Sequence, residues 1–158
     1  EKVAPLFHQS DYVIGNLEFP LAGAEAGYTK SFFVFNAPDA YAVAVKNAGV
    51  DLISTVNNHT LDRGAEGILR TMRVLDEIGL PYVGTTPLEK EREGAYYFEQ
   101  NGVKFAVVSY TYGINEKIPE ESDCAQHINS GRERNEMGGN AVAAKSCTEL
   151  NHFRTVFC

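Results

Sequence analysis

The side chains best suited to chemistry follow a short apolar run near the middle of the chain. The run Val50–Val56 leads directly into Asn57, Asn58 and His59. If this run is a buried strand, its carboxyl end lies at the rim of the sheet, where ligands of α/β proteins tend to bind. A histidine at that rim could protonate a leaving oxygen as a general acid. The competing interpretation is a plain turn, because asparagine tolerates positive φ and is common in turns.

A carboxylate and another asparagine follow an earlier β-favouring run, Tyr12–Ile14. Gly15 closes this run, and Asn16 and Glu18 follow. Two strands of one sheet would place Glu18 on the same rim as His59. Carboxylate, amide and imidazole donors suit divalent ions such as Mn²⁺, Zn²⁺, Fe²⁺ or Mg²⁺. A pair of such ions could clamp a phosphate ester and lower the pKa of a bound water.

Other polar residues at the ends of predicted elements could line a substrate cleft at this rim. They are Asn16, Asn36, Asn57, Arg63 and Tyr112. Arg63 could hold an anion through its guanidinium fork, or it could be a solvated neighbour of a helix start. The preceding residue, Asp62, suits the N-cap of that helix, where its side chain would accept a hydrogen bond from a backbone N–H group.

Two helical patterns flank the central run and would position its ends. In the first, Pro38 and Asp39 suit the opening turn and Gly49 suits the end. Its apolar residues recur at helical spacing: Tyr41, Val45 and Ala48. The second helix is predicted to start after Asp62 and to end at Gly79. Its apolar face is formed by Ile68, Met72, Leu75 and Ile78.

Further strands are predicted after the second helix. Residues 81–84 form a short strand, and residues 95–99 and 103–110 flank the dipeptide Asn101-Gly102, a strong hairpin signal. The order strand, helix, strand, helix, strand and hairpin predicts an α/β domain with a largely parallel or mixed sheet. The phenylalanine-rich segment Ser31–Asn36 is predicted to be a short buried strand or an apolar plug.

Composition excludes several function classes. The chain has 158 residues, about one domain, and 44% hydrophobic residues allow a core. A formal net charge of -7 argues against a nucleic-acid partner and against attraction to an anionic membrane. No window reaches the roughly 18 apolar residues of a membrane span. The cysteines lack the spacing of a zinc site or a disulfide framework: Cys124, Cys147 and Cys158.

The two ends of the chain differ from its middle. The chain begins at Glu1 without a targeting segment, so we expect the N-terminus to be cut. Residues 116–158 show little periodicity, whereas a packed domain has matched hydrophobic patterning throughout. We therefore expect this tail to be either a loosely ordered extension or sequence foreign to the domain, such as a shifted reading frame, and we favour the second.

Several motifs, in this order, resemble the bacterial CapA family of capsule, or poly-γ-glutamate, biosynthesis proteins. They are Asp11–Glu18, Phe35–Pro38, Gly49–Gly64 and Ser109–Gly113. The resemblance covers roughly Leu6–Asn115 and stops in the tail. It divides the chain into a CapA-like α/β core fragment at residues 1–115 and a non-matching, weakly patterned tail at residues 116–158.

The CapA family resembles the calcineurin-like metallophosphoesterases. The implied fold is a calcineurin-like metallophosphatase sandwich with βαβ layers and a mixed sheet, incomplete at both ends. By this resemblance Asn58 is a metal ligand, His59 is the catalytic group near the leaving oxygen, and Glu18 is a metal-bridging carboxylate. The chain departs from the pattern at Asn57, where the phosphoesterases have Gly, and at Thr60, where they have Asp or Glu. The Gly-Asp, His-Trp-Gly and Gly-His-x-x-His motifs of complete members are absent.

The resemblance implies a role in making or handling an anionic extracellular polymer. Its chemistry would be metal-dependent, phosphoesterase-like hydrolysis, with the anionic polymer or a phosphate ester as substrate. The alternatives are a non-catalytic polymer-binding or assembly component, with membrane capsule-synthase subunits as partners, and an inactive truncated product. The full-length family member is expected at the extracellular face of the bacterial membrane.

Overall fold

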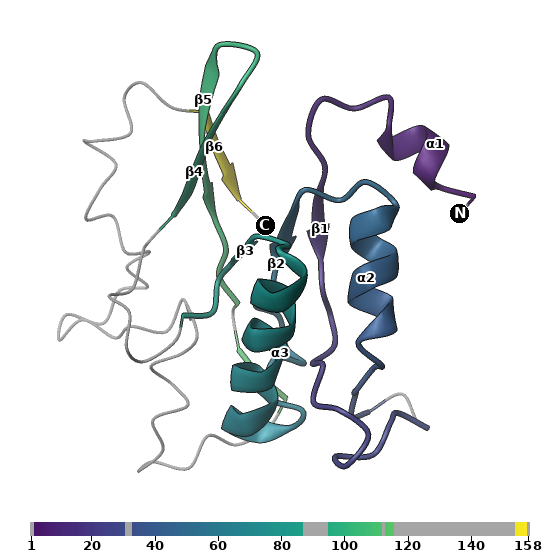
Figure 1. The fold of residues 1–158 in the computed structure, drawn as a ribbon. Coiled ribbons are helices and arrows are strands. Elements are labelled where there is room, and N and C mark those ends of the chain that lie inside the picture. Colours follow the sequence, from purple (N-terminus) through teal and green to yellow (C-terminus); the bar gives the residue numbers. More distant parts are fainter. Residues whose placement is uncertain (1, 31–32, 87–94, 112, 116–153, 158) are drawn as a thin grey trace, which may run out of the picture.

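Three short parallel strands form the sheet that carries the predicted rim. The computed structural model describes all residues except 1, 31–32, 87–94, 112, 116–153 and 158 (Figure 1). The strands are β1 (Ile14–Asn16), β2 (Leu52–Ser54) and β3 (Tyr82–Val83), in the order β1-β2-β3. Their pairing is parallel, so the carboxyl ends of all three strands meet at one edge of the sheet.

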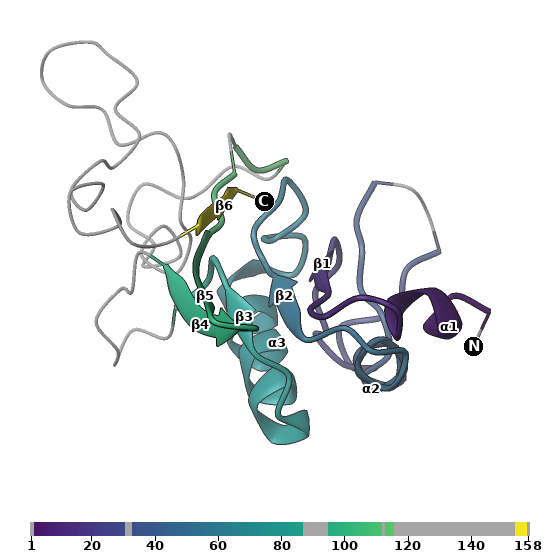
Figure 2. The same ribbon diagram turned by 90° about the horizontal axis from the view of Figure 1, so that it is seen from above.

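Two helices connect these strands and cover one face of the sheet. α2 (Ala40–Asn47) lies between β1 and β2 in the chain, and α3 (Gly64–Ile78) lies between β2 and β3. Both helices lie on the same side of the sheet, as Figures 1 and 2 show from two directions, while the short α1 (Ala4–Phe7) lies near the N-terminus. The predicted end of α3 is confirmed, because Gly79 adopts the left-handed conformation with φ 62°.

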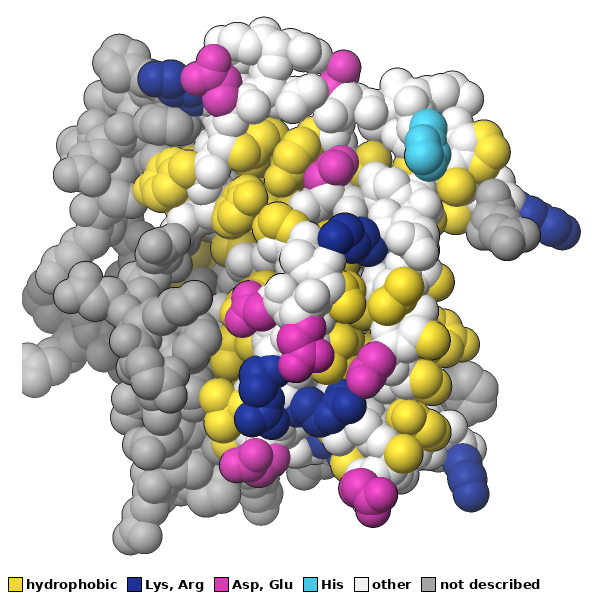
Figure 3. All heavy atoms as spheres, viewed as in Figure 1, with side chains coloured by type: hydrophobic (Ala, Val, Ile, Leu, Met, Phe, Trp, Pro, Cys, Tyr) yellow, Lys and Arg dark blue, Asp and Glu magenta, His cyan; other side chains and the backbone are white. Residues whose placement is uncertain are grey.

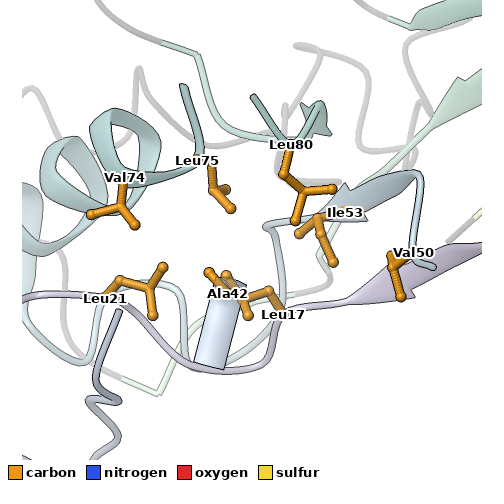
Figure 4. Packing of buried hydrophobic residues seen from close by; sticks show 8 residues of the cluster. All are labelled: Leu17, Leu21, Ala42, Val50, Ile53, Val74, Leu75 and Leu80. Carbon is orange, nitrogen blue, oxygen red and sulfur yellow. The ribbon is translucent and has the colours of Figure 1, made fainter. Parts of the chain in front are cut away.

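The hydrophobic core between the two helices and the first sheet includes residues of the segment that follows β1. We call it the helix-side core, and Figure 4 shows its side chains pointing toward one another. Its buried members are Leu17, Leu21, Ala42, Val50, Ile53, Val74, Leu75 and Leu80. Leu17 and Leu21 belong to the segment after β1, so their burial holds that segment against the helices.

A second sheet packs on the other face of the first. β4 (Tyr96–Gln100) and β5 (Val103–Val108) are antiparallel, and β6 (Arg154–Phe157) pairs with β5 in parallel. Val107 of β5 is buried with Leu52 and Val83 of the first sheet, and the rings of Tyr12 and Phe98 stack at 3.8 Å between centroids. The predicted α/β class with parallel and antiparallel pairing is thus confirmed.

The hairpin was predicted correctly, but two other segments differ from expectation. Asn101 and Gly102 have φ values of 52° and 74°, as a tight hairpin turn requires. β1 begins at Ile14 and includes Gly15, which lies so close to Ile53 and Val50 that a Cβ atom would sit 3.3 and 3.4 Å from them. No strand forms at residues 33–36, where Phe33 is 81% exposed.

Part of the tail forms regular structure that the sequence did not predict. Residues 154–157 make β6, because backbone pairing along the edge of β5 needs no hydrophobic periodicity. Residues 116–153 lie outside the described part of the chain. Within the described ranges, no helix has the length and hydrophobicity to cross a membrane.

One ion pair joins α3 to the residue before α2. Arg70 donates to both carboxylate oxygens of Asp39, at 2.7 and 2.8 Å, and to the carbonyl oxygen of Leu21. The hydrogen bonds from the guanidinium lower the pKa of the Asp39 carboxyl below its usual value. Since the Arg70 and Asp39 side chains are 32% and 45% exposed, solvent screens much of this attraction.

We predict that Leu75→Ala lowers the free energy of unfolding by about 2–5 kcal/mol, because it leaves a cavity in the helix-side core. Leu75 is fully buried, whereas Val43 on α2 is 41% exposed. The matched control Val43→Ala should therefore cost much less. Urea denaturation of both variants measures the difference, and equal losses would contradict this description of the core.

We predict that Asp39→Asn lowers the free energy of unfolding at pH 7 by less than about 1 kcal/mol. Because the pKa of Asp39 is lowered in the folded state, the stabilisation is present above the ordinary aspartate pKa and is lost as the pH falls through the lowered value. The difference between wild type and variant should shrink as the pH drops below about 4. A difference that stays constant from pH 7 to pH 2 would refute this assignment.

Candidate functional site

Segments that follow β1, β2 and β5 meet at the carboxyl edge of the first sheet, where α3 begins (Figure 1). Asn57, just after β2, joins two of these segments. Its Nδ2 donates to the Leu17 carbonyl at 2.9 Å and to Asn16 Oδ1 at 3.2 Å. Its Oδ1 accepts the backbone N–H of His59 at 2.9 Å. The Asn57 side chain therefore fixes the turn that carries His59 against the end of β1.

His59 is held by a buried carboxylate. Its Nδ1 lies 2.7 Å from Oδ2 of Asp62, and the two side chains are only 10% and 1% exposed. The backbone N–H of Phe35 donates to the same Oδ2 at 2.6 Å. The Phe35 ring lies against the imidazole, with 4.1 Å between centroids and 32° between planes. The imidazole is thus fixed by a hydrogen bond at one nitrogen and by an aromatic ring beside it.

The prediction that Asp62 caps α3 is wrong. α3 begins at Gly64, its N-cap position is Arg63, and no side chain caps it. The backbone N–H of Asp62 donates to the carbonyl of His59 at 3.0 Å, and this tight turn brings the carboxylate beside the imidazole. Asp62 is the functional candidate that sequence reasoning missed. The spacing His59-x-x-Asp62 within one turn was the signal that could have found it.

Asn58 is partnered by an asparagine from the segment after β5. The N–H of Asn115 donates to the Asn58 carbonyl at 2.8 Å, and Asn58 Nδ2 donates to Asn115 Oδ1 at 3.3 Å. The Asn115 amide nitrogen also lies 3.4 and 3.5 Å from the two ring nitrogens of His59. Among the described residues, no donor bonds to Oδ1 of Asn58. That oxygen remains available to a ligand.

Glu18 lies two residues beyond β1 with an exposed side chain. Its carboxylate forms no hydrogen bond or ion pair with any part of the chain that the structure describes. Carboxylate and amide oxygens are ligand types that hard divalent ions prefer, and Glu18 and Asn58 supply one of each. The described residues contain no group of three His, Cys, Asp or Glu side chains that could enclose a metal ion. Glu18 and Asn58 would therefore be part of a ligand shell.

The remaining predicted residues lie in different surroundings. Asn36 is 2% exposed, and its amide binds three backbone groups of the loop at residues 22–27. Arg63 donates to the carbonyls of Asp62 and Gly27 at 2.9 and 3.2 Å. Tyr112 lies outside the described residues. Substrate contact by Asn36, Arg63 and Tyr112 stays a prediction.

Comparison with known proteins gives the family. The family model described as "Bacterial capsule synthesis protein PGA_cap" matches residues 1–150. The chain belongs to the PGA_cap family. This confirms the resemblance to CapA that the motifs indicated.

Two curated relatives of this PGA_cap chain carry the CapA name. The capsule biosynthesis protein CapA of Bacillus anthracis is 35% identical over 112 residues, which are 69% of this chain and 27% of the relative. The PGA biosynthesis protein CapA of Bacillus subtilis (strain 168) is 28% identical over 111 residues, 69% of this chain and 29% of the relative. The chain thus matches less than a third of the length of either relative.

We predict that Asn57→Ala lowers the free energy of unfolding of this PGA_cap chain by about 1–3 kcal/mol, because it removes the side-chain bonds that join the two strand ends. The matched control is Asn47→Ala, at an exposed position that ends α2, and it should change stability by less than about 0.5 kcal/mol. Urea denaturation measures both values. Equal effects would show that Asn57 does not fix the rim.

Proposed function

We propose that this PGA_cap chain acts in the synthesis of a bacterial capsule or poly-γ-glutamate, and that its rim is part of a metal-dependent, phosphoesterase-like hydrolytic site. Family membership and the CapA relatives support the biosynthetic role. The observation that carries the hydrolytic proposal is the geometry of His59. Nδ1 is bound by buried Asp62, and Nε2 lies 3.5 Å from the amide nitrogen of Asn115, whose side-chain oxygen accepts a hydrogen bond from Asn58.

His59 would transfer a proton to the leaving oxygen of the substrate. An ionised carboxylate only accepts hydrogen bonds, so the proton shared with Asp62 belongs on Nδ1 of His59. A second proton would then sit on Nε2, and this is the one that the imidazole would donate. Phe35 covers part of the ring and keeps water from it, which strengthens the polar interactions of the imidazole.

Glu18 and Asn58 would hold the metal through oxygen atoms that the described residues leave unpaired. A bound divalent ion would supply Lewis-acid activation of a water and of the phosphoryl group. The charge balance of the rim supports a need for such a cation. Glu18, Asp62 and Glu66 are acidic, and the guanidinium of Arg63 already binds two backbone carbonyls. An anionic polymer or phosphate ester would be repelled here unless a cation neutralised these carboxylates.

A second candidate function is a non-catalytic, polymer-binding or assembly component of a capsule-synthase complex at the extracellular face of the membrane. Exposed apolar side chains on the helix side of the molecule favour it. Tyr41 and Val43 of α2 are 56% and 41% exposed, and Figure 3 shows hydrophobic side chains gathered over this helix. Such residues suit a surface that a protein partner covers.

The two functions are separated by assaying a generic phosphodiester with Mn²⁺. The hydrolytic proposal predicts turnover that requires the metal and falls about 10²–10⁴-fold in His59→Gln, because general acid catalysis contributes that much. Glu18→Gln should weaken the dependence on Mn²⁺. Asp51→Asn, whose carboxylate accepts the N–H of Val13 away from the rim, should leave the rate unchanged.

Absence of turnover with Mn²⁺, Zn²⁺, Fe²⁺ and Mg²⁺ would remove the hydrolytic proposal. Cells provide the test of the biosynthetic role. Polymer should be lost when the gene carries His59→Gln if the rim is catalytic. Wild-type polymer levels in that variant, together with loss in Tyr41→Asp, would favour the assembly role.

A further inference from the structure

Asp62 has an unusual environment for a carboxylate. Its side chain is 1% exposed, and both of its donors, the N–H of Phe35 and Nδ1 of His59, bind the same oxygen, Oδ2. The other oxygen, Oδ1, is buried and has no hydrogen-bond partner among the described residues. Burying a carboxylate oxygen without a donor costs stability. A buried unsatisfied group therefore calls for an explanation, and among the described residues the only side-chain partner of Asp62 is His59.

The hydrogen bond to Asp62 determines which nitrogen of His59 carries a proton. A neutral imidazole has one N–H and one lone pair, and an ionised carboxylate only accepts hydrogen bonds. The 2.7 Å contact therefore requires the proton on Nδ1. The Asn115 amide nitrogen lies 3.4 and 3.5 Å from the two ring nitrogens, and with the proton on Nδ1 only Nε2 can accept a hydrogen bond from it. Nε2 thus keeps its lone pair on the side of the ring away from Asp62.

A backbone donor holds the carboxylate in turn. Phe35 donates its N–H to Asp62 and lays its ring against His59, so one residue fixes both members of the pair. The next residue, Asn36, binds the carbonyls of Gly23 and Gly27. The loop after β1 therefore supports the orientation of the imidazole through Asp62.

We infer that Asp62 is the positioning residue of His59, which keeps the proton on Nδ1 and presents Nε2 to the rim. The catalytic consequence rests on the hydrolytic function proposed above, whereas the protonation pattern of the ring does not. In a hydrolytic site, the nitrogen that faces the substrate must be the one that exchanges the proton. Loss of the Asp62 acceptor would leave His59 present but in the wrong tautomer.

The test is the tautomer of His59, read from long-range ¹H–¹⁵N NMR spectra of the labelled full chain at alkaline pH, where neutral histidine is observed. The chain has four histidines, and His59→Gln identifies the signal of His59. In the wild type we expect the proton on Nδ1. Asp62→Leu should shift the population to the Nε2–H form. Asp62→Asn offers an acceptor oxygen at the same place and should keep the Nδ1–H form.

Asp51→Asn is the matched control, since that carboxylate also binds a backbone N–H but lies on another segment, and it should leave the tautomer unchanged. A wild-type His59 in the Nε2–H form would overturn the inference, and this measurement does not depend on the folding of an Asp62 variant. An unchanged tautomer in a folded Asp62→Leu would also overturn it. A variant that merely lost stability would show no selective change at His59.

Activity gives a separate readout. If the chain hydrolyses phosphodiesters, Asp62→Leu should lower kcat by about 10²–10⁴-fold with little change in KM, as expected for a wrongly protonated histidine. The Nδ1–H tautomer without any turnover would support the role of Asp62 and remove the hydrolytic function. If turnover depends on His59 but not on Asp62, and His59 is in the Nε2–H form, the hydrolytic function would be supported and the role of Asp62 would be removed.

Discussion

A single buried oxygen, Oδ2 of Asp62, links the segments on which the rim depends. It accepts hydrogen bonds from His59, in the turn after β2, and from Phe35, in the loop after β1. These residues are far apart in sequence, so their shared acceptor holds two strand ends in one arrangement. Low exposure makes both bonds stronger than they would be in water. Without this oxygen, the imidazole and the Phe35 backbone would lose the acceptor that they share.

The fold places this carboxylate by packing and by backbone conformation. The N–H of Leu21 donates to the hydroxyl of Thr71 on α3 at 2.8 Å, which ties the loop after β1 to the helix. Gly64 turns the chain into α3 with φ 63°, a conformation that side chains disfavour, and its Cβ position faces open space. The helix can therefore start directly after Asp62 while the carboxylate points back to His59. These contacts fix the turn that carries His59 and Asp62.

Sequence patterns predicted which segments share a rim, but not which atoms meet there. β2, the hairpin and α3 were predicted, because apolar runs, turn dipeptides and helix ends follow from local preferences. Their bounds in the structure are shifted from the predicted ones. The contact of Asp62 with His59 was hidden because an Asp before a helix equally suits an N-cap. The contacts of Phe35 and Asn115 with His59 are long-range, and no local pattern encodes them. β6 was missed because it pairs in parallel with β5 from a distant part of the chain, and no local pattern encodes such a pairing.

The hydrolytic function proposed for this chain requires that the rim bind a divalent ion through Asn58 and Glu18 beside His59. Its most direct test is the broadening of histidine ring signals in NMR spectra as paramagnetic Mn²⁺ is added. His8, exposed next to α1, serves as the internal control. We predict that the His59 signal broadens first and that a variant carrying both Glu18→Gln and Asn58→Ala abolishes this preference. Equal broadening of His8 and His59, or the same preference in that double variant, would contradict the claim.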